Sequence, residues 1–154
     1  ETITFVVCFN KGTLIRTISG EKRVEEIEQG KHVFNQPAGH LEANESLQQA
    51  AIRETLEETG WHVNLEAALG TVLFKAPANG VTYMRTTFIA QVDHFDPDYS
   101  LDKDIDEAIW LSYEAIVDLK DQLRSPIVLD VIDEYRAGHR IALERFTCLN
   151  LNNE

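Results

Sequence analysis

The segment from Gly39 to Trp61 constrains the fold of this chain more than any other, because both ends of a helix can be recognised in it. Asn44 can cap the free N–H groups of a first turn, and Glu45 at the first helical position suits the positive end of the helix dipole. Gly60 can adopt the left-handed conformation that ends a helix. The segment therefore predicts a loop, a helix from about Glu45 to Thr59, and a second loop.

Three carboxylates gather on one side of this expected helix. At about 100° per residue, Glu54, Glu57 and Glu58 fall within an arc of roughly 100°, on the side that also carries Leu47, Ala50 and Ala51. Clustered carboxylates repel one another and resist losing water, whereas the apolar residues favour burial. A bound hard cation would resolve this conflict. The alternative is a solvated acidic surface, which is the usual environment of glutamates.

The opposite side of the helix is also apolar, and it carries Ile52 and Leu56, so we expect the helix to be buried on two sides with its carboxylates beside a cleft. Arg53 lies next to the carboxylates. A guanidinium can hold one carboxylate in a fixed orientation through a two-pronged hydrogen bond, which is the support that metal-binding carboxylates usually have. The alternative role for Arg53 is an ordinary surface ion pair.

The spacing of these residues matches the pattern G-x5-E-x7-R-E-U-x-E-E-x-G-U, in which U is a large apolar residue. All seven fixed positions are present, as Gly39, Glu45, Arg53, Glu54, Glu57, Glu58 and Gly60. The chain departs from the pattern only at two U positions, where Thr55 and Trp61 stand, and these positions concern packing. The segment resembles the Nudix box, and the chain is similar to members of the Nudix family.

Composition limits the possible classes of protein. The chain has 154 residues and is 44% hydrophobic, so we expect one domain that covers residues 1–154. It has 14 basic and 26 acidic residues, and a formal charge of −12 disfavours binding to nucleic acid or to an anionic membrane. An anionic substrate would need cations to approach.

The cysteines and the apolar stretches bear on localisation. Two distant cysteines, Cys8 and Cys148, indicate neither a disulfide framework nor a zinc site, which suits the cytoplasm. No apolar stretch approaches transmembrane length, and Ile3–Phe9 lacks the basic flank and the cleavage-like ending of a secretory signal.

Alternation and turn residues predict the other elements. The expected strands are Ile3–Phe9, Thr13–Ser19 and Lys22–Glu28 joined through Gly20–Glu21, a weaker strand Lys31–Asn35, a hairpin of Leu69–Ala76 and Val81–Val92, and Ala108–Leu111. Ser112 is expected to cap a helix to about Lys120, and Ser125–Pro126 to begin another that Gly138 ends. The apolar residues of this last helix have helical spacing and are expected in the core, namely Ile127, Val128, Val131, Ile132 and Tyr135.

Two further groups of charged residues are candidates for the cleft. Arg85 lies in mid-strand, on the face with Tyr83, Thr87 and Ile89, where it could either extend to the surface or bind a phosphate. The segment from Asp93 to Glu107 is an acidic loop whose members are expected to be mostly solvated. The acids nearest the following strand can reach the cleft as an additional base or metal ligand, and these are Asp104, Asp106 and Glu107.

The resemblance implies a fold, a reaction and a cofactor. The expected fold class is α+β, an α/β/α sandwich with a mixed β-sheet and a loop–helix–loop motif, and the implied reaction is hydrolysis of diphosphates linked to another group. Mg²⁺, with Mn²⁺ as a substitute, suits ligands that are all oxygen. Carried over by position, the ligands become Glu54, Glu57, Glu58 and the Gly39 carbonyl, with Arg53 as the orienting group and Glu45 in a structural role.

Longer segments indicate the substrate class. Residues 34–42 and 123–126 resemble bacterial phosphatases of the family that act on nucleoside tri- and diphosphates, thiamine pyrophosphate and its hydroxymethylpyrimidine pyrophosphate precursor. The resemblance is poor over residues 13–22. Arg85 and Arg124 are the expected phosphate contacts, because both are cations in an acidic chain and Arg124 precedes an expected helix start.

The sequence leaves several alternatives open. An ADP-ribose pyrophosphatase would favour a proline near Pro77, which lies one residue from the usual spacing. A non-catalytic nucleotide sensor usually lacks carboxylates of the box, and this chain keeps them all. The general base could be a glutamate of the box or an acid of residues 102–107, with His40 less suited. The expected partners are a small-molecule pyrophosphate and, at most, further copies of the chain, as a monomer or small homo-oligomer.

Overall fold

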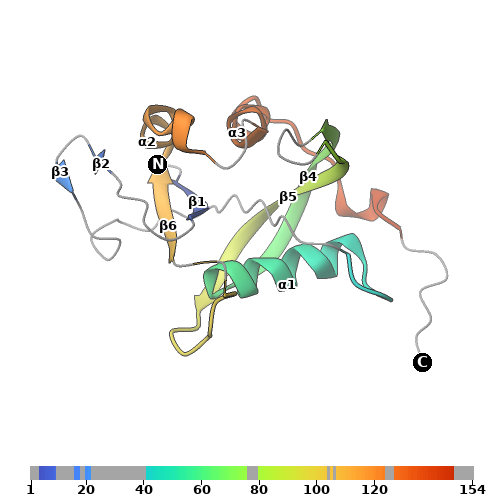
Figure 1. Ribbon diagram of the computed structural model, residues 1–154. Coiled ribbons are helices and arrows are strands. Elements are labelled where there is room, and N and C mark those ends of the chain that lie inside the picture. The colour runs from blue at the N-terminus through green and yellow to red at the C-terminus, as the bar shows by residue number, and fades with distance from the viewer. Residues whose placement is uncertain are drawn as a thin grey trace.

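The structure of this protein is a computed structural model, shown in Figure 1. It describes residues 4–9, 16–17, 20–21, 41–75, 80–103, 105, 107–123 and 127–147, with only the backbone for 4–9, 16–17, 20–21, 107 and 122. The strands are β1 (Thr4–Phe9), β2 (Arg16–Thr17), β3 (Gly20–Glu21), β4 (Trp61–Lys75), β5 (Thr82–Phe95) and β6 (Glu107–Ser112). The helices are α1 (Leu47–Thr59), α2 (Tyr113–Asp118), η2 (Lys120–Gln122), α3 (Ile127–Arg136) and η3 (Leu143–Arg145).

Helix α1 is the predicted helix of the box, but it begins later than expected. Its N-cap is Ser46, which accepts from the Gln49 N–H while the Gln49 side chain accepts from the Ser46 N–H. Asn44 was the wrong cap, because its φ of 64° is left-handed and it lies two residues outside the cap. Glu45 therefore precedes the helix. Gly60 ends it as predicted, with a φ of 72° and its N–H donated to the Leu56 carbonyl.

Strands β4 and β5 form an antiparallel hairpin that is longer than the sequence predicted. β4 begins at Trp61, not at Leu69, and β5 continues to Phe95, which pairs with Trp61. The additional residues include polar ones such as Asn64 and Glu66, which occupy exposed alternate positions. Three irregularities in the register also interrupt the period-two pattern. These features hid the strand pattern in the sequence, although β4 and β5 pair from Trp61 to Lys75.

The remaining strands agree with the sequence in part. β1 and β6 lie where predicted and pair antiparallel, with Phe5 opposite Leu111. Gly20–Glu21, predicted as a turn, instead forms β3 and pairs with Arg16–Thr17 of β2. The other residues of the predicted strand Thr13–Ser19 lie outside the described residues, as do the predicted strands Lys22–Glu28 and Lys31–Asn35. All three pairings between described strands are antiparallel, so the parallel pairing of a mixed sheet stays a prediction.

The β4–β5 hairpin separates two hydrophobic cores. Ile89 of β5 packs with α2 and α3, in a cluster that also contains Ile109, Ile116 and Ile132. The preceding residue, Phe88, packs instead with Ala51 of α1 and Ala68 of β4. Figure 1 shows α1 on one side of the hairpin and α2 with α3 on the other. This arrangement confirms the predicted sandwich of helix, sheet and helix.

The C-terminal part of the described chain agrees with the predicted helices. Ser112 caps α2 by accepting from the Ala115 N–H at 3.3 Å. The residues of α3 that were predicted to be core are buried, except for Val128, which is partly buried. Gly138, with a φ of 84°, follows α3 and lets His139 N–H donate to the Glu134 carbonyl at 3.2 Å. None of the helices in the described residues is long and apolar enough to cross a membrane.

The segment after α3 returns to the α1 side of the sheet, which the sequence did not indicate. Ile141 and Ala68 exchange backbone hydrogen bonds of 2.7 and 2.8 Å. The Phe146 ring lies 5.5 Å from the Phe88 ring, and the Phe146 carbonyl accepts from Gln48 Nε2 at 3.1 Å. The end of the described chain thus supports the helix that carries the box.

Candidate active site

Helix α1 holds its carboxylates at the edge of its buried side. Glu54 and Glu58 lie one turn apart and each is only 8% exposed, beside the buried Thr55 and Ala51. The Thr55 hydroxyl donates to the Ala51 carbonyl at 2.6 Å, which explains how a polar residue is accommodated at a position that is usually aliphatic. The predicted second buried side is wrong, because Ile52 is 39% exposed. Leu56, the other residue of that side, is partly buried, so the helix is fully buried on one side only.

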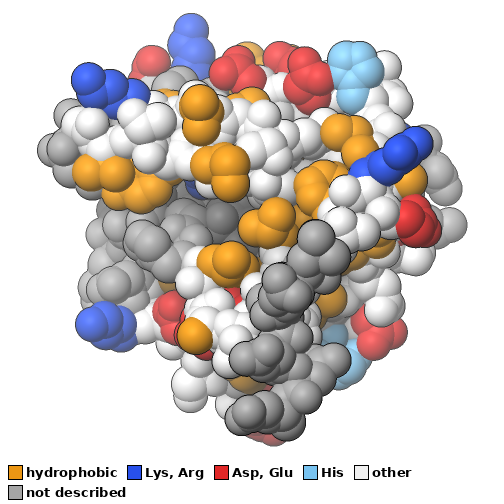
Figure 2. Space-filling view, turned by 90° about the vertical axis from the view of Figure 1, so that its right-hand side faces the viewer, with side chains coloured by type: hydrophobic (Ala, Val, Ile, Leu, Met, Phe, Trp, Pro, Cys, Tyr) orange, Lys and Arg blue, Asp and Glu red, His pale blue; other side chains and the backbone are white. Residues whose placement is uncertain are grey.

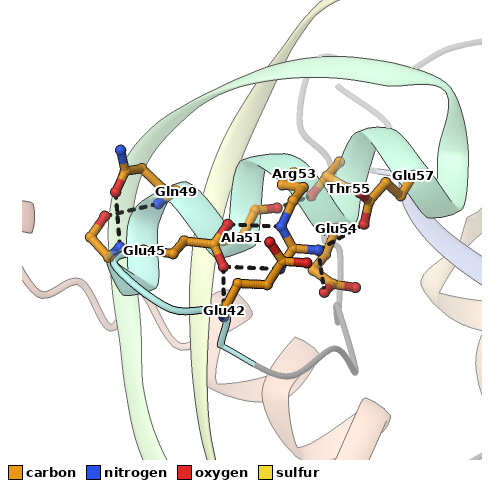
Figure 3. Close-up of polar contacts among 9 residues, drawn as sticks. Glu42, Glu45, Gln49, Ala51, Arg53, Glu54, Thr55 and Glu57 are labelled. Atoms are coloured by element: carbon orange, nitrogen blue, oxygen red, sulfur yellow. Dashed lines mark hydrogen bonds and ion pairs between the residues drawn. The ribbon is translucent and has the colours of Figure 1, made fainter. Parts of the chain in front are cut away.

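Arg53 connects the carboxylates, as Figure 3 shows. Its Nε and Nη2 donate to the two oxygens of Glu45 at 2.7 and 2.9 Å. Its Nη1 donates to Glu54 Oε1 at 2.7 Å and to Glu57 Oε2 at 2.8 Å. Arg53 thus contacts both Glu54 and Glu57 through one nitrogen, but its two-pronged contact is to Glu45. Glu45 lies on the loop before the helix and can align with the plane of the guanidinium, whereas the two helical glutamates both approach one nitrogen.

The same contacts tie the loop before α1 to the helix. Glu45 Oε2 also accepts from the Glu42 N–H at 3.1 Å. Hydrogen bonding to Arg53 holds the pKa of Glu45 below its usual range, and the Glu45 carboxylate raises the pKa of Arg53 above its own. One guanidinium faces three carboxylates, so the group of Glu45, Arg53, Glu54 and Glu57 keeps an excess of negative charge. Such a group favours a cation in its neighbourhood.

Two backbone hydrogen bonds bring the acidic loop to the C-terminal end of α1. The Asp96 N–H donates to the Gly60 carbonyl at 2.9 Å, and the Asp102 N–H donates to the Glu57 carbonyl at 2.9 Å. The loop that precedes β6 is therefore anchored beside two of the carboxylates of the helix. The sequence predicted acidic residues near the cleft. It contains no signal for these contacts, because they are made by backbone atoms, which every residue has.

The other candidate residues are placed only in part. Gly39, Asp104, Asp106 and Arg124 lie outside the described residues, and of Glu107 only the backbone is described, at the start of β6. Arg85 lies on β5 opposite Val72 and shares a face with Ile89, which packs with α2 and α3. The described contacts therefore do not bring Arg85 to the carboxylates of α1.

The carboxylates of α1 suit a hard divalent cation in chemistry, since all their donor atoms are oxygen. Within the described part of the chain, no three acidic, histidine or cysteine side chains converge closely enough to hold an ion. Arg53 contacts one oxygen of Glu54 and one of Glu57, and each carboxylate has a second oxygen that can bind a cation. The donor set fits, and the predicted Gly39 carbonyl and the acids at 104–107 would have to complete it.

Comparison with known proteins places these features in a family. The family model named NUDIX domain matches residues 5–131. The protein named phosphatase NudJ is 40% identical over 121 residues in Escherichia coli K12 and in Shigella flexneri, covering 79% of this chain and 78% of theirs. A solved NUDIX hydrolase from Nitrosomonas europaea is 39% identical, with a TM-score of 0.72 over 95% of this chain and 97% of that one. Because the match contains the carboxylate helix and covers most of the chain, this protein belongs to the Nudix family and is a hydrolase of phosphoric anhydride bonds.

Proposed function

We propose that this chain is a Mg²⁺-dependent phosphohydrolase that releases phosphate from nucleoside di- and triphosphates and from thiamine or hydroxymethylpyrimidine pyrophosphates, with Mn²⁺ as a substitute. The observation that carries the proposal is the arrangement around Arg53, which holds Glu54 and Glu57 side by side on a helix that also buries Glu58. Carboxylates that are fixed in this way can receive a cation without first being reordered.

Glu54, Glu57 and Glu58 would hold the cation, with the Gly39 carbonyl as a further ligand. A divalent ion supplies positive charge for a pyrophosphate and acts as a Lewis acid toward it. This role accounts for the retention of partly buried carboxylates in a chain whose formal charge of −12 repels anionic substrates.

The residues of the chain prepare the site for attack by water on phosphorus. Arg53 keeps Glu54 and Glu57 in one orientation, and Glu45 keeps Arg53 in place. The backbone contact between Asp102 and Glu57 holds the acidic loop close to the helix. A carboxylate of the box or of residues 102–107 then accepts the proton of the attacking water.

The proposed substrates rest on similarity to phosphatase NudJ. Arg85 and Arg124 are the proposed phosphate contacts, although Arg85 shares a face of β5 with Ile89, which packs with α2 and α3. Arg85→Ala or Arg124→Ala should weaken nucleotide and thiamine pyrophosphate binding alike if these residues contact the shared phosphate. Loss confined to nucleotides would indicate recognition of the base instead.

Phosphate release from a panel of substrates tests the proposal. The panel contains nucleoside di- and triphosphates, thiamine pyrophosphate and ADP-ribose, each assayed with Mg²⁺ and again with excess chelator. We expect release from the first three only when Mg²⁺ is present. Preference for ADP-ribose would favour the pyrophosphatase alternative, and nucleotide binding without turnover of any substrate would favour a sensor.

A further inference from the structure

The distal end of the β4–β5 hairpin exposes a pair of large apolar side chains. Leu73 of β4 and Met84 of β5 lie directly opposite each other in the register and are 75% and 69% exposed. They are the two most exposed of the large hydrophobic residues in the described part of the chain. Cross-strand neighbours of this kind present one continuous apolar surface to water. Contiguous exposed apolar surface of this kind is a candidate interaction site.

The two adjacent cross-strand pairs on the same face carry one charge between them, that of Lys75. Thr71 and Thr86 form the next pair on the same face, and their hydroxyls are hydrogen-bonded to each other at 2.8 Å. On the other side of the pair lie Lys75 and Thr82, which are also opposite each other. We call Thr71, Leu73, Met84 and Thr86 the hairpin patch. Figure 2, which faces the right-hand side of Figure 1, shows apolar side chains gathered in the middle of the view and charged ones mostly at its margin.

We propose that the hairpin patch packs against the same patch of a second copy of this chain, around a two-fold axis. In such a dimer each residue near the axis meets its own counterpart, so that a charged residue there would repel itself. The hairpin patch contains no charged residue, although the chain has 26 acidic residues and a formal charge of −12. It is therefore a part of the surface at which two such acidic chains can approach.

Other occupants fit the hairpin patch less well. An anionic membrane attracts surfaces rich in lysine and arginine, and Lys75 is the one basic residue among the six that form these three cross-strand pairs. A charged peptide would require countercharges, which these pairs do not supply beyond Lys75. A second copy supplies an uncharged apolar surface of the same shape. Two large apolar residues per chain make a small interface, so we expect a weak dimer that forms only at high protein concentration.

Sedimentation velocity over a wide range of protein concentration, about 5 μM to 1 mM, tests the proposal. The variants are Leu73→Glu and Leu73→Lys, with Ile52→Glu and Ile52→Lys as matched controls at an exposed apolar residue of α1. A glutamate variant could prevent a dimer either by disrupting the hairpin patch or by increasing the general repulsion between acidic chains. The lysine variants distinguish these two explanations, because each lowers the magnitude of the net charge and so decreases the general repulsion. We expect the average mass to rise with concentration for the parent and for both Ile52 variants. Both Leu73 variants should remain monomeric.

Met84→Glu provides an independent variant in case a Leu73 variant is poorly folded, and thermal unfolding checks the fold of each. A parent that is monomeric up to 1 mM would overturn the proposal, as would a dimer that both Leu73→Lys and Met84→Glu leave intact. A dimer that forms only after removal of residues 148–154 would assign the hairpin patch to the chain's own C-terminal segment and also overturn it. The readout is mass, so it is independent of the proposed function.

Discussion

The two sides of the β4–β5 hairpin are built from different kinds of side chain. On the side of α2 and α3, the four large residues Ile89, Ile109, Ile116 and Ile132 are almost completely buried. On the side of α1, the buried cluster consists of Ala51, Ala68 and Phe88, and the helix also buries Glu54, Thr55, Glu58 and Thr59. One side is a core of branched aliphatic residues, and the other combines small residues with polar ones.

Because of this difference, the two sides should contribute differently to the stability of the fold and to its activity. Burial of aliphatic side chains stabilises the fold in proportion to the area removed from water, so the α2–α3 side should contribute most of the stability. Burial of a carboxylate costs free energy unless other groups compensate it. The α1 side therefore gives up stability in order to hold oxygen donors in fixed positions, a compromise that is common at functional sites. Substitutions on the two sides should accordingly affect different measurements.

The largest expected effect is the loss of activity in Glu57→Gln and Glu58→Gln. A neutral amide binds a hard divalent cation poorly, and we expect turnover to fall by roughly a hundredfold or more, because metal-assisted charge stabilisation contributes several kcal/mol. Phosphate release at saturating Mg²⁺ measures the effect, and thermal unfolding should show a midpoint close to that of the parent. Turnover equal to that of the parent would contradict the assignment of these residues as ligands.

Ile132→Ala should lower the stability of the fold and leave the activity unchanged. Ile132 is 2% exposed in the α2–α3 core, and truncation of such a residue costs about 2–5 kcal/mol of unfolding free energy. Urea unfolding measures this loss. Turnover per folded molecule should remain unchanged, because α1 and its carboxylates lie on the other side of the sheet. A large drop in turnover of the folded fraction would show that the two sides are not separate.

Arg53→Lys tests the support of the carboxylates, and its effect should be smaller than removal of a ligand. Lysine keeps the charge but cannot contact Glu45 with two nitrogens and also reach Glu54 and Glu57. Support of this kind usually contributes a factor of about 10–100 in activity or metal affinity. Turnover and Mg²⁺ titration of the variant measure it. Superimposable titration curves and equal turnover would reduce Arg53 to an ordinary ion pair.

The sequence predicted the parts of the molecule that depend on local signals. Gly60 at the end of α1, Ser112 at the start of α2 and the apolar spacing of α3 were all found where expected. The spacing of the box also placed Arg53 within hydrogen-bonding reach of Glu54 and Glu57. These signals operate within one or two turns of a helix, where residue type and spacing determine the contact.

The errors arose where distant or competing contacts decide the outcome. Asn44 and Ser46 are both good caps, and the reciprocal hydrogen bonds with Gln49 favour Ser46. The beginning of β4 depends on pairing with the end of β5, which lies more than thirty residues away in the chain. The contact of Phe146 with Phe88 likewise joins distant segments. A single sequence contains no local signal for such pairs.

The smallest expected effect concerns pH, and it tests whether Glu45 stabilises the loop before α1. Hydrogen bonding to Arg53 lowers the pKa of Glu45 in the folded protein. A carboxyl group with a depressed pKa contributes stability at pH values above its unfolded pKa of about 4.3 and loses it as the pH falls through the folded pKa. The parent should therefore lose more stability than Glu45→Gln as the pH is lowered from 7 to about 3.

Urea unfolding of the parent and of Glu45→Gln at each pH measures this difference, with Glu144→Gln as a control for the loss of one exposed carboxylate. At pH 7 the parent should be the more stable, since the glutamine leaves Arg53 without its two-pronged partner. The stabilities of the two proteins should converge at acid pH, while those of the parent and Glu144→Gln stay parallel. Parallel curves for Glu45→Gln as well would mean that the contact orients Arg53 without stabilising the fold.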